Sequence, residues 1–217
     1  MTLRPACLSD IPALNALIAQ SGIALSRGFY SDAQARAMTR QVYGVDTQLI
    51  VDGTYYAIET GAMDDDAMAD DAMADDAMAD AAMADAAIVA CGGWSKRGTL
   101  FGSDHAKAHG HGHGHPHDPN RADPPLDCAT DAARIRAFFV APPYARRGLG
   151  SQLMRHCAAE AWAAGFRRLT LVSTLPGEPL YAAFGFTVDD RFELTLDDGL
   201  CVPLSNMSRE LSRPNLD

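Results

Sequence analysis

The sequence has no apolar run long enough to cross a membrane. A helix that spans a bilayer needs about 18 or more consecutive apolar residues, and every apolar stretch of this 217-residue chain is shorter. Arg4, Pro5, Asp10 and Pro12 interrupt the first residues, so the apolar core of a signal peptide is missing as well. We therefore expect a cytoplasmic protein that does not bind a membrane.

Cysteine is scarce and follows no pattern. The five cysteines are odd in number, widely spaced and without a C-x-x-C pair. They are Cys7, Cys91, Cys128, Cys157 and Cys201. Neither a disulfide framework nor a zinc knot is indicated. We expect reduced thiols that are mostly buried.

Basic residues form no stripe along the chain. The net charge is −10, but nine of the 28 acidic residues lie within residues 61–86, and outside that segment 19 acidic residues stand against 18 basic ones. A nucleic-acid-binding surface requires a concentration of Lys and Arg. A nearly neutral body with an acidic insert therefore argues against a nucleic-acid partner.

Two segments of biased composition interrupt what we expect to be a single domain over residues 1–217. The first insert, residues 61–86, contains the units AMDDD, AMADD, AMADD, AMADA and AMADA from Ala62 onward. Because a period of five keeps no constant face on a helix or a strand, we expect a low-complexity expansion. An acidic tract that binds cations or a partner is the alternative.

If the insert is left out, residues 54–59 are followed closely by residues 87–95 in the sequence. These two β-rich runs predict a hairpin.

The second insert, residues 104–130, is rich in His, Gly and Pro. Six of the seven histidines lie in it, five of them alternating along residues 109–117. Imidazole is a good ligand for Zn, Ni and Cu, but this spacing specifies no geometry, and a flexible tract loses entropy when it binds. We expect adventitious metal binding in vitro and no dedicated metal site. A biological metal role and a plain solvated loop are the alternatives.

The rest of the chain alternates between strand and helix patterns. Expected strands cover residues 3–6, 47–51, 54–59, 87–95, 133–140, 168–173, 187–196 and 201–210. Expected helices cover residues 11–21, 32–43, 148–164 and 179–184. Ser9 or Asp10 can cap the first helix and Ser31 the second. This order predicts a mixed α/β sheet.

A glycine-rich turn between a predicted strand and the helix that follows it indicates an anion site. Unpaired N–H groups and the positive end of the helix converge there. Gly148 and Gly150 let the main chain approach an anion closely, and Arg146 and Arg147 add positive charge. With no third glycine at Leu153 and no Gly-Lys-Ser/Thr, the turn matches neither a dinucleotide fingerprint nor a P-loop. A tight structural turn is the alternative.

The pattern around this turn resembles the acetyl-CoA-dependent N-acetyltransferase superfamily abbreviated GNAT. That family has a strand, then Q/R-x-x-G-x-G/A opening a helix, and later a strand, a short helix with Tyr, and Gly-Phe. This chain has ARRGLG at residues 145–150, a strand pattern at residues 169–173 and LYAAFGF at residues 180–186. Ala145 stands where the family usually has Gln or Arg. Since the loop acts mainly through backbone N–H groups, we expect binding to survive this change.

The resemblance covers the chain apart from the two inserts. It implies a mixed, mostly antiparallel central sheet flanked by helices, with two low-complexity loop inserts. It also implies acetyl-CoA as co-substrate, with the main chain of Phe138, Phe139 and Val140 against the pantetheine arm. The residues expected to hold the pyrophosphate are Arg146, Arg147, Gly148, Leu149, Gly150 and Ser151.

The implied reaction is that of an acyltransferase, in which a neutral primary amine attacks the acetyl thioester directly. An alkyl amine with a pKa of about 10.4 is neutral in about one molecule in 10³ at pH 7, which is equivalent to about 4.6 kcal/mol. A base or a desolvating pocket must supply that energy. Glu59 and Glu178 are candidate bases, with a water chain or the backbone as the default and a surface charge as the alternative role of either carboxylate.

Tyr181 lies four residues before Gly185, where the family has a phenol that meets the departing sulfur. A phenol with a pKa near 10 is a weaker acid than a thiol near 8.5, so complete proton transfer is uphill by about 2 kcal/mol. We expect Tyr181 to act catalytically by donating a hydrogen bond to the developing thiolate. A packing role is the alternative.

Other residues give weaker indications. His156 and Cys157 are adjacent on a predicted helix and point about 100° apart, so we do not expect a nucleophile pair. Arg27 would border the acceptor site in the family. The acceptor, a small-molecule or peptide amine, stays open, and so does a homodimer. A non-catalytic acyl-CoA-binding or metal-handling protein on the same fold is the alternative function, against which Tyr181 and the glycines argue.

Overall fold

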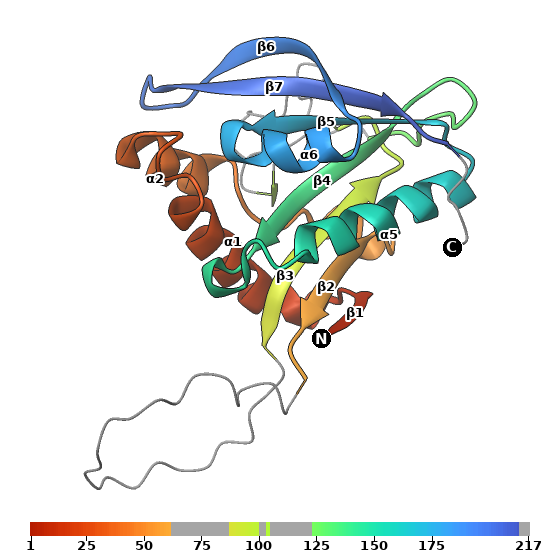
Figure 1. The fold of residues 1–217 in the computed structure, drawn as a ribbon, viewed down its shortest axis with the longest axis horizontal. Coiled ribbons are helices and arrows are strands. Elements are labelled where there is room, and N and C mark those ends of the chain that lie inside the picture. Colours follow the sequence, from red (N-terminus) through yellow and green to blue (C-terminus); the bar gives the residue numbers. More distant parts are fainter. Residues whose placement is uncertain (62–86, 100–102, 105–122, 213–217) are drawn as a thin grey trace, which may run out of the picture.

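A seven-stranded sheet organises the computed structural model, which describes residues 1–61, 87–99, 103–104 and 123–212. The strand order is β1-β2-β3-β4-β5-β7-β6, and every neighbouring pair is antiparallel except β4 and β5. The strands are β1 Thr2–Pro5, β2 Tyr55–Glu59, β3 Ile88–Ser95, β4 Ala133–Val140, β5 Arg168–Thr174, β6 Thr187–Thr195 and β7 Cys201–Glu210. The expected mixed, mostly antiparallel sheet is confirmed (Figure 1).

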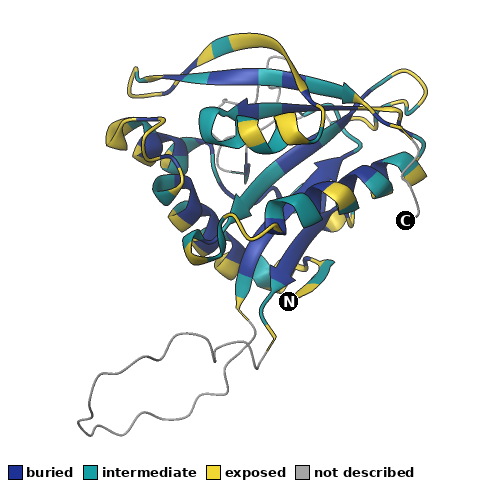
Figure 2. Cartoon of the chain, in the orientation of Figure 1, coloured by how far each residue is buried: buried dark blue, intermediate teal, exposed yellow. Residues whose placement is uncertain are grey.

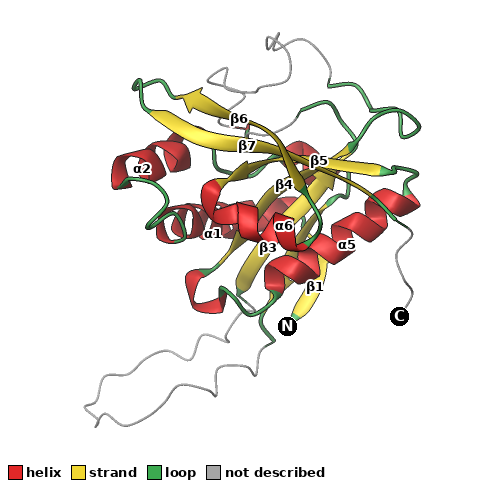
Figure 3. Ribbon diagram, turned by 45° about the horizontal axis from the view of Figure 1, so that its top comes forward, coloured by secondary structure: helices red, strands yellow, loops and turns green. Residues whose placement is uncertain are grey.

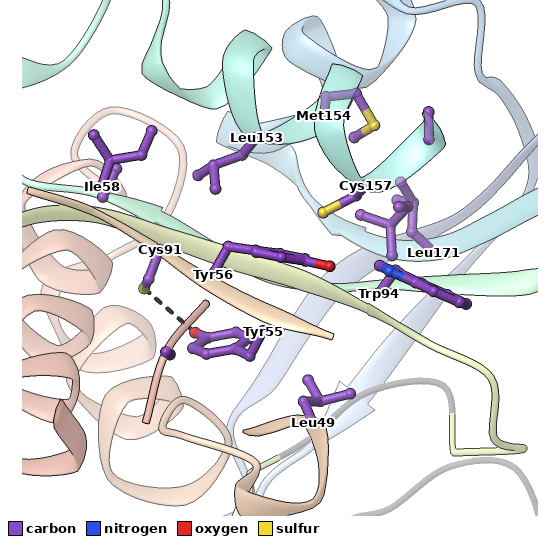
Figure 4. Packing of buried hydrophobic residues seen from close by; sticks show 14 of the residues in the cluster. Leu49, Tyr55, Tyr56, Ile58, Cys91, Trp94, Leu153, Met154, Cys157 and Leu171 are labelled. Atoms are coloured by element: carbon purple, nitrogen blue, oxygen red, sulfur yellow. Dashed lines mark hydrogen bonds between the residues drawn. The ribbon is translucent and has the colours of Figure 1, made fainter. Parts of the chain in front are cut away.

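Helices cover both faces of this sheet. They are α1 Ile11–Ala24, α2 Asp32–Gln41, α3 Thr47–Val51, α5 Leu149–Ala163 and α6 Glu178–Ala183. α5 and α6 lie on one side of the sheet (Figure 3), and α1 packs against β3 and β4 from the other. Adjacent residues of β2 mark the two faces: Tyr56 lies on the side of Leu153 and Cys157, and Tyr55 on the side of Leu49 (Figure 4).

Side chains cap α2 as expected but do not cap α1. Ser31 accepts a hydrogen bond from the main-chain N–H of Gln34 at 3.2 Å, and the Gln34 side chain accepts one from the N–H of Ser31 at 2.9 Å. Asp10 precedes α1, yet its carboxylate accepts hydrogen bonds from Arg4 at 2.7 and 2.9 Å instead of capping the helix. The charge-assisted hydrogen bonds from Arg4 are stronger than a hydrogen bond from a main-chain N–H, so the carboxylate binds Arg4.

β2 and β3 form the hairpin that the sequence predicts across the first insert. Their register runs from Tyr55↔Gly93 to Glu59↔Ile88, and the N–H of Thr60 donates to the carbonyl of Ala87 at 3.0 Å. The repeat at residues 62–86 and the alternating histidines of residues 109–117 lie outside the described residues.

Residues 47–51 form the helix α3, so the strand expected there is wrong. The side chain of Asp46 accepts a hydrogen bond from the main-chain N–H of Gln48 at 3.1 Å and caps the helix. Leu49 and Ile50 are buried against the core, and Gly53 follows the helix with a φ of 71°. The Asp46 cap, the glycine that ends the helix and the burial of two of its residues outweigh the weak β preference of Thr, Ile and Val.

Two apolar clusters fill the interior, a larger one that continues from β2 across β5 and a smaller one between α2 and the strands β6 and β7. The larger cluster joins α1, α3 and α5 to strands β2 to β5. The smaller one packs α2 residues such as Met38 and Val42 against Leu194, Val202 and Leu204 of β6 and β7. The central strands are buried, whereas the outer strand β6 is largely exposed (Figure 2). The junction between the clusters is where a cleft forms.

Candidate active site

The parallel strands β4 and β5 are paired at one end only. Its register contains Ala133↔Leu169 and Arg134↔Thr170, at the start of both strands. Beyond that point β5 stays in register with β7, while β4 follows β3. The two halves of the sheet therefore diverge, and within the described chain the edge of β4 from Ile135 onward has no β5 partner. A cleft opens there in the middle of the sheet.

A β-bulge on β4 shapes the wall of this cleft. The register shifts between Cys91 and Gly93, so β4 contains one residue more than β3 at this point. Ala137 adopts a left-handed φ of 55°, which is unfavourable for a residue with a Cβ. The Tyr55 hydroxyl donates a hydrogen bond to the Ala137 carbonyl at 3.2 Å and stabilises the bulge. Such bulges redirect the side chains that follow.

Phe138 and Phe139 follow the bulge and face opposite sides of the sheet. The Phe138 ring lies over Gly92, where an added Cβ would come within 2.3 Å of it. Its centre is 6.4 Å from that of Tyr181. The Phe139 ring instead packs edge-on against Tyr43, with 5.3 Å between the ring centres. Neighbouring aromatic residues thus line the two ends of one cleft.

The turn before α5 presents main-chain N–H groups to solvent. Arg146 and Gly148 are exposed and have left-handed φ angles of 63° and 85°. The N–H groups of the first three residues of α5 have no acceptor within the described chain, as is usual for a first helical turn. A Cβ on Gly148 would meet no atom within 4 Å. The turn therefore offers donors, a positive helix end and open space, which together fit a phosphate group.

Tyr181 lies at the edge of the cleft on α6. Its ring centre is 5.9 Å from that of Phe186 as well as close to Phe138. Burial, together with the nearby Cys157 thiol, raises the pKa of the Tyr181 hydroxyl above its usual value. The phenol therefore stays protonated around neutral pH, and it can donate a hydrogen bond.

α6 is held against both the turn and β7. A Cβ on Gly150 would come within 3.1 Å of Leu180, so the glycine allows α6 to lie on the start of α5. Glu178 accepts hydrogen bonds from Arg191 at 2.6 and 3.0 Å and from the Ser205 hydroxyl at 2.6 Å. Arg191, and to a lesser extent Ser205, lowers the pKa of the Glu178 carboxyl. These contacts fix the position of Tyr181 beside the turn.

A pocket fills the cleft from α6 to α2. Phe138 and Tyr181 line one end of it. At the other end the pocket is lined by Met38, Val42, Tyr43, Phe139, Val172 and Leu204. The pocket therefore brings together Phe138, Phe139 and Tyr181 of the residues expected from the sequence. Val140 pairs with Ala90, and residues 146–151, which form the turn and the first residues of α5, do not line this pocket.

The sequence does not indicate the α2 end of the pocket, because the residues that line it come from four elements. Met38 and Val42 belong to α2 and its end, and Val172 and Leu204 to β5 and β7. In the sequence, each belongs to a pattern typical of core residues. Only the divergence of β4 and β5 turns these core positions into the wall of a pocket.

Neither candidate base lines this pocket. Glu59 forms an ion pair with Arg4, which also binds Asp10 at 2.7 Å. Glu178 accepts the three hydrogen bonds described above, and its lowered pKa makes it a poorer base. Arg27 is exposed in the α1–α2 connection and does not line the pocket either.

His156 and Cys157 lie in packed surroundings on α5. The His156 ring meets Tyr56 edge-on at 4.3 Å between centres. Cys157 is fully buried, and burial raises the pKa of its thiol. In the part of the chain that the structure describes, no cluster of three or more His, Cys, Asp or Glu residues could hold a metal ion. No helix among these residues is long and apolar enough to cross a membrane.

Comparison with known proteins gives a consistent result. The model of the acetyltransferase (GNAT) family matches residues 60–186. A GCN5-related N-acetyltransferase from Rhodopseudomonas palustris superposes with a TM-score of 0.59 at 14% identity, covering 97% of this chain and 95% of that one. A phosphinothricin acetyltransferase from Sinorhizobium meliloti, solved with acetyl-CoA, gives 0.54 at 14% identity, covering 100% and 91%. At these identities the likeness concerns the fold. No curated protein sequence gives a significant match.

Proposed function

The chain belongs to the acetyltransferase (GNAT) family, and from this premise we propose that it transfers the acetyl group of acetyl-CoA to a primary amine by direct attack. It is an acyltransferase with acetyl-CoA as its co-substrate. One arrangement carries the proposal for the amine reaction: the edge of β4 and Tyr181 border one cleft, and Leu180, the neighbour of Tyr181, lies against Gly150 in the first turn of α5.

The residues around the cleft fit the co-substrate. The N–H groups of residues 146–151, with the guanidinium groups of Arg146 and Arg147, would hold the pyrophosphate. The main chain of Phe138, Phe139 and Val140 lies along the diverging edge of β4, where an extended amide-containing arm can pair with it as an added strand does. Gly148 leaves room for the anion.

Tyr181 would act as a hydrogen-bond donor to the sulfur that leaves. As the amine nitrogen bonds to the acetyl carbon, the carbon–sulfur bond breaks and negative charge grows on sulfur. A phenol whose pKa is raised by burial donates a hydrogen bond to that charge and does not lose its proton outright.

The pocket itself would help to supply the neutral amine. Desolvation disfavours a charged ammonium and lowers its pKa, and the acceptor end is lined by apolar side chains such as Val42, Val172 and Leu204. This reduces the demand for a carboxylate base, in keeping with the ion pairs that engage Glu59 and Glu178. The proton lost by the nitrogen after attack would pass to water at the mouth of the cleft.

Free-thiol release from acetyl-CoA across a panel of primary amines tests this function, with the N-acetyl product identified by mass spectrometry. Transfer to at least one amine, dependent on Tyr181, is the expected result. Binding of acetyl-CoA without transfer to any amine would contradict it. Location in the cytoplasm, a homodimer and the choice between a small-molecule and a peptide acceptor stay predictions at this point.

A further inference from the structure

The far end of the pocket is walled by side chains that belong to the α2 face of the sheet. Val172 of β5 packs against the smaller apolar cluster, which contains Met38, Val42 and Leu204. Tyr181 lies at the other end, on α6, next to the turn before α5. The α2 end is therefore left for the acceptor.

Tyr43 is a rigid part of this wall. A Cβ on Gly22 of α1 would come within 2.7 Å of the Tyr43 ring, so the ring rests directly on the helix backbone. Phe139 also packs edge-on against this ring. Because α1 and Phe139 both hold Tyr43, the pocket has a fixed width at this point.

The charge at this end is already neutralised. Arg136 is the one charged residue among the described residues that line the pocket. Its guanidinium donates to Asp46 at 2.9 Å, and both side chains are only 3% exposed. It also donates to the carbonyl of Thr99 at 3.0 Å. A second ammonium or a carboxylate on the acceptor would therefore be desolvated beside an ion pair that is already satisfied, which is unfavourable.

The size of the pocket limits the apolar group that fits. Its volume is about 120 Å³, and an apolar cavity of about 150 Å³ in another protein accepts benzene. Because the acetyl group occupies the Tyr181 end, the α2 end takes an apolar group no larger than one ring or one short branched chain. A peptide, which branches at the carbon next to the amine, brings a second, polar substituent that the apolar lining does not stabilise.

We propose that the acceptor is a small primary monoamine with one apolar group of about the size of a single ring, and that this group binds between Tyr43, Phe139, Val172 and Leu204. The inference rests on the proposed function, since it names the amine class that the same cleft selects. It assigns specificity to the smaller apolar cluster and its neighbours, which no motif of the sequence indicates.

Acceptor kinetics test the class directly. With saturating acetyl-CoA, kcat/KM for 2-phenylethylamine is expected to exceed that for ethylamine by about 10- to 100-fold, because the ring is taken out of water. It is also expected to exceed that for 1,3-diaminopropane and for a peptide with N-terminal Phe by about 10-fold or more. Equal or better turnover of ethylamine, the diamine or the peptide would overturn the proposal.

A pair of variants changes the charge at one pocket position with little change in shape. Val172 is half-buried in β5, lines the pocket and packs against the smaller apolar cluster. Val172→Asp places a carboxylate in the acceptor end, and Val172→Asn is the neutral control of the same size. Relative to Val172→Asn, Val172→Asp is expected to raise the ratio of diamine to 2-phenylethylamine turnover by about 10-fold, since the carboxylate pairs with the second ammonium. An unchanged ratio would overturn the assignment of this end to the acceptor.

Calorimetry on the protein loaded with CoA separates this inference from the function on which it rests. If 2-phenylethylamine binds and ethylamine does not, yet no amine is acetylated, the apolar site stands and the proposed function fails. If the diamine or the peptide is the better acceptor, the proposed function stands and the apolar class is wrong.

Discussion

The two ends of the cleft recognise their ligands by different means. The turn before α5, which lies next to the Tyr181 end, is exposed, carries two arginines and offers main-chain N–H groups. The end at α2 is apolar and is built from side chains of α2, β4, β5 and β7. A backbone site requires a particular local conformation, so it leaves a short glycine motif in the sequence. A side-chain site assembled from distant elements leaves none.

The two ends should also respond to different substitutions. The turn has empty space around Gly148, so added volume matters less there than added charge. The α2 end has its width set by Tyr43, Gly22 and Phe139 in direct contact, so added volume matters there most. Substitutions at each end therefore distinguish the two.

Gly148→Glu should abolish the binding of acetyl-CoA, with Kd raised by at least about 100-fold. The new carboxylate would lie at the phosphate position, and like charges placed together cost several kcal/mol. Gly148→Ala is the matched control: it has the same unfavourable φ, 85° in the structure, but no charge, and should weaken binding by no more than about 10-fold. Calorimetry gives both values. Equal Kd values for the Glu and Ala variants would contradict an anion site at this turn.

Tyr181→Phe should lower kcat by about 10² and leave the Kd of acetyl-CoA and the melting temperature nearly unchanged. The Phe ring keeps the contacts with Phe138 and Phe186 and removes only the hydroxyl. Steady-state kinetics and thermal unfolding of the same preparation supply the three quantities. A fully active Phe variant would assign Tyr181 to packing.

The sequence predicted those features that depend on neighbours along the chain. The hairpin of β2 and β3, the cap at Ser31 and the turn before α5 are local patterns, and the structure contains all three. The strand predicted at residues 47–51 is wrong because the cap from Asp46 favours a helix in spite of the β-branched composition.

What the sequence did not predict depends on contacts between distant elements. The α2 end of the pocket exists because β4 leaves β5 after two paired positions, and no single segment encodes that divergence. Likewise, the pairing of Glu59 with Arg4 and of Glu178 with Arg191 could not be inferred from positions so far apart. These ion pairs bear on the identity of the base, which was the least determined part of the site.

Gly22→Ala should raise KM for ring-bearing amines by about 5-fold, since overpacking pushes Tyr43 into the pocket. The added Cβ would lie 2.7 Å from Cδ2 and 2.9 Å from Cε2 of Tyr43. Ethylamine, which needs no room beside the ring, is the control acceptor and should keep its KM within about 2-fold. The Kd of acetyl-CoA should not change. If KM rises equally for both amines, Tyr43 does not set the width of the acceptor end.

Glu178→Gln should have the smallest effect, because Glu178 holds α6 in place and does not move protons. The Arg191 guanidinium lowers the pKa of the carboxyl below its ordinary 4.5, so its stabilising effect is present above that value and is lost as the pH falls through the lowered pKa. Arg191 has a side chain 57% exposed, and exposed pairs contribute little, so the melting temperature at pH 7 should fall by no more than about 3 °C. The variant should also lose the part of the acid-induced destabilisation that comes from this carboxyl.

The kcat of Glu178→Gln should stay within about 2-fold of the original, whereas loss of a general base would cost about 10² or more. A loss of that size, with a changed pH profile of kcat/KM, would make Glu178 the base and show that the apolar pocket alone does not supply the neutral amine.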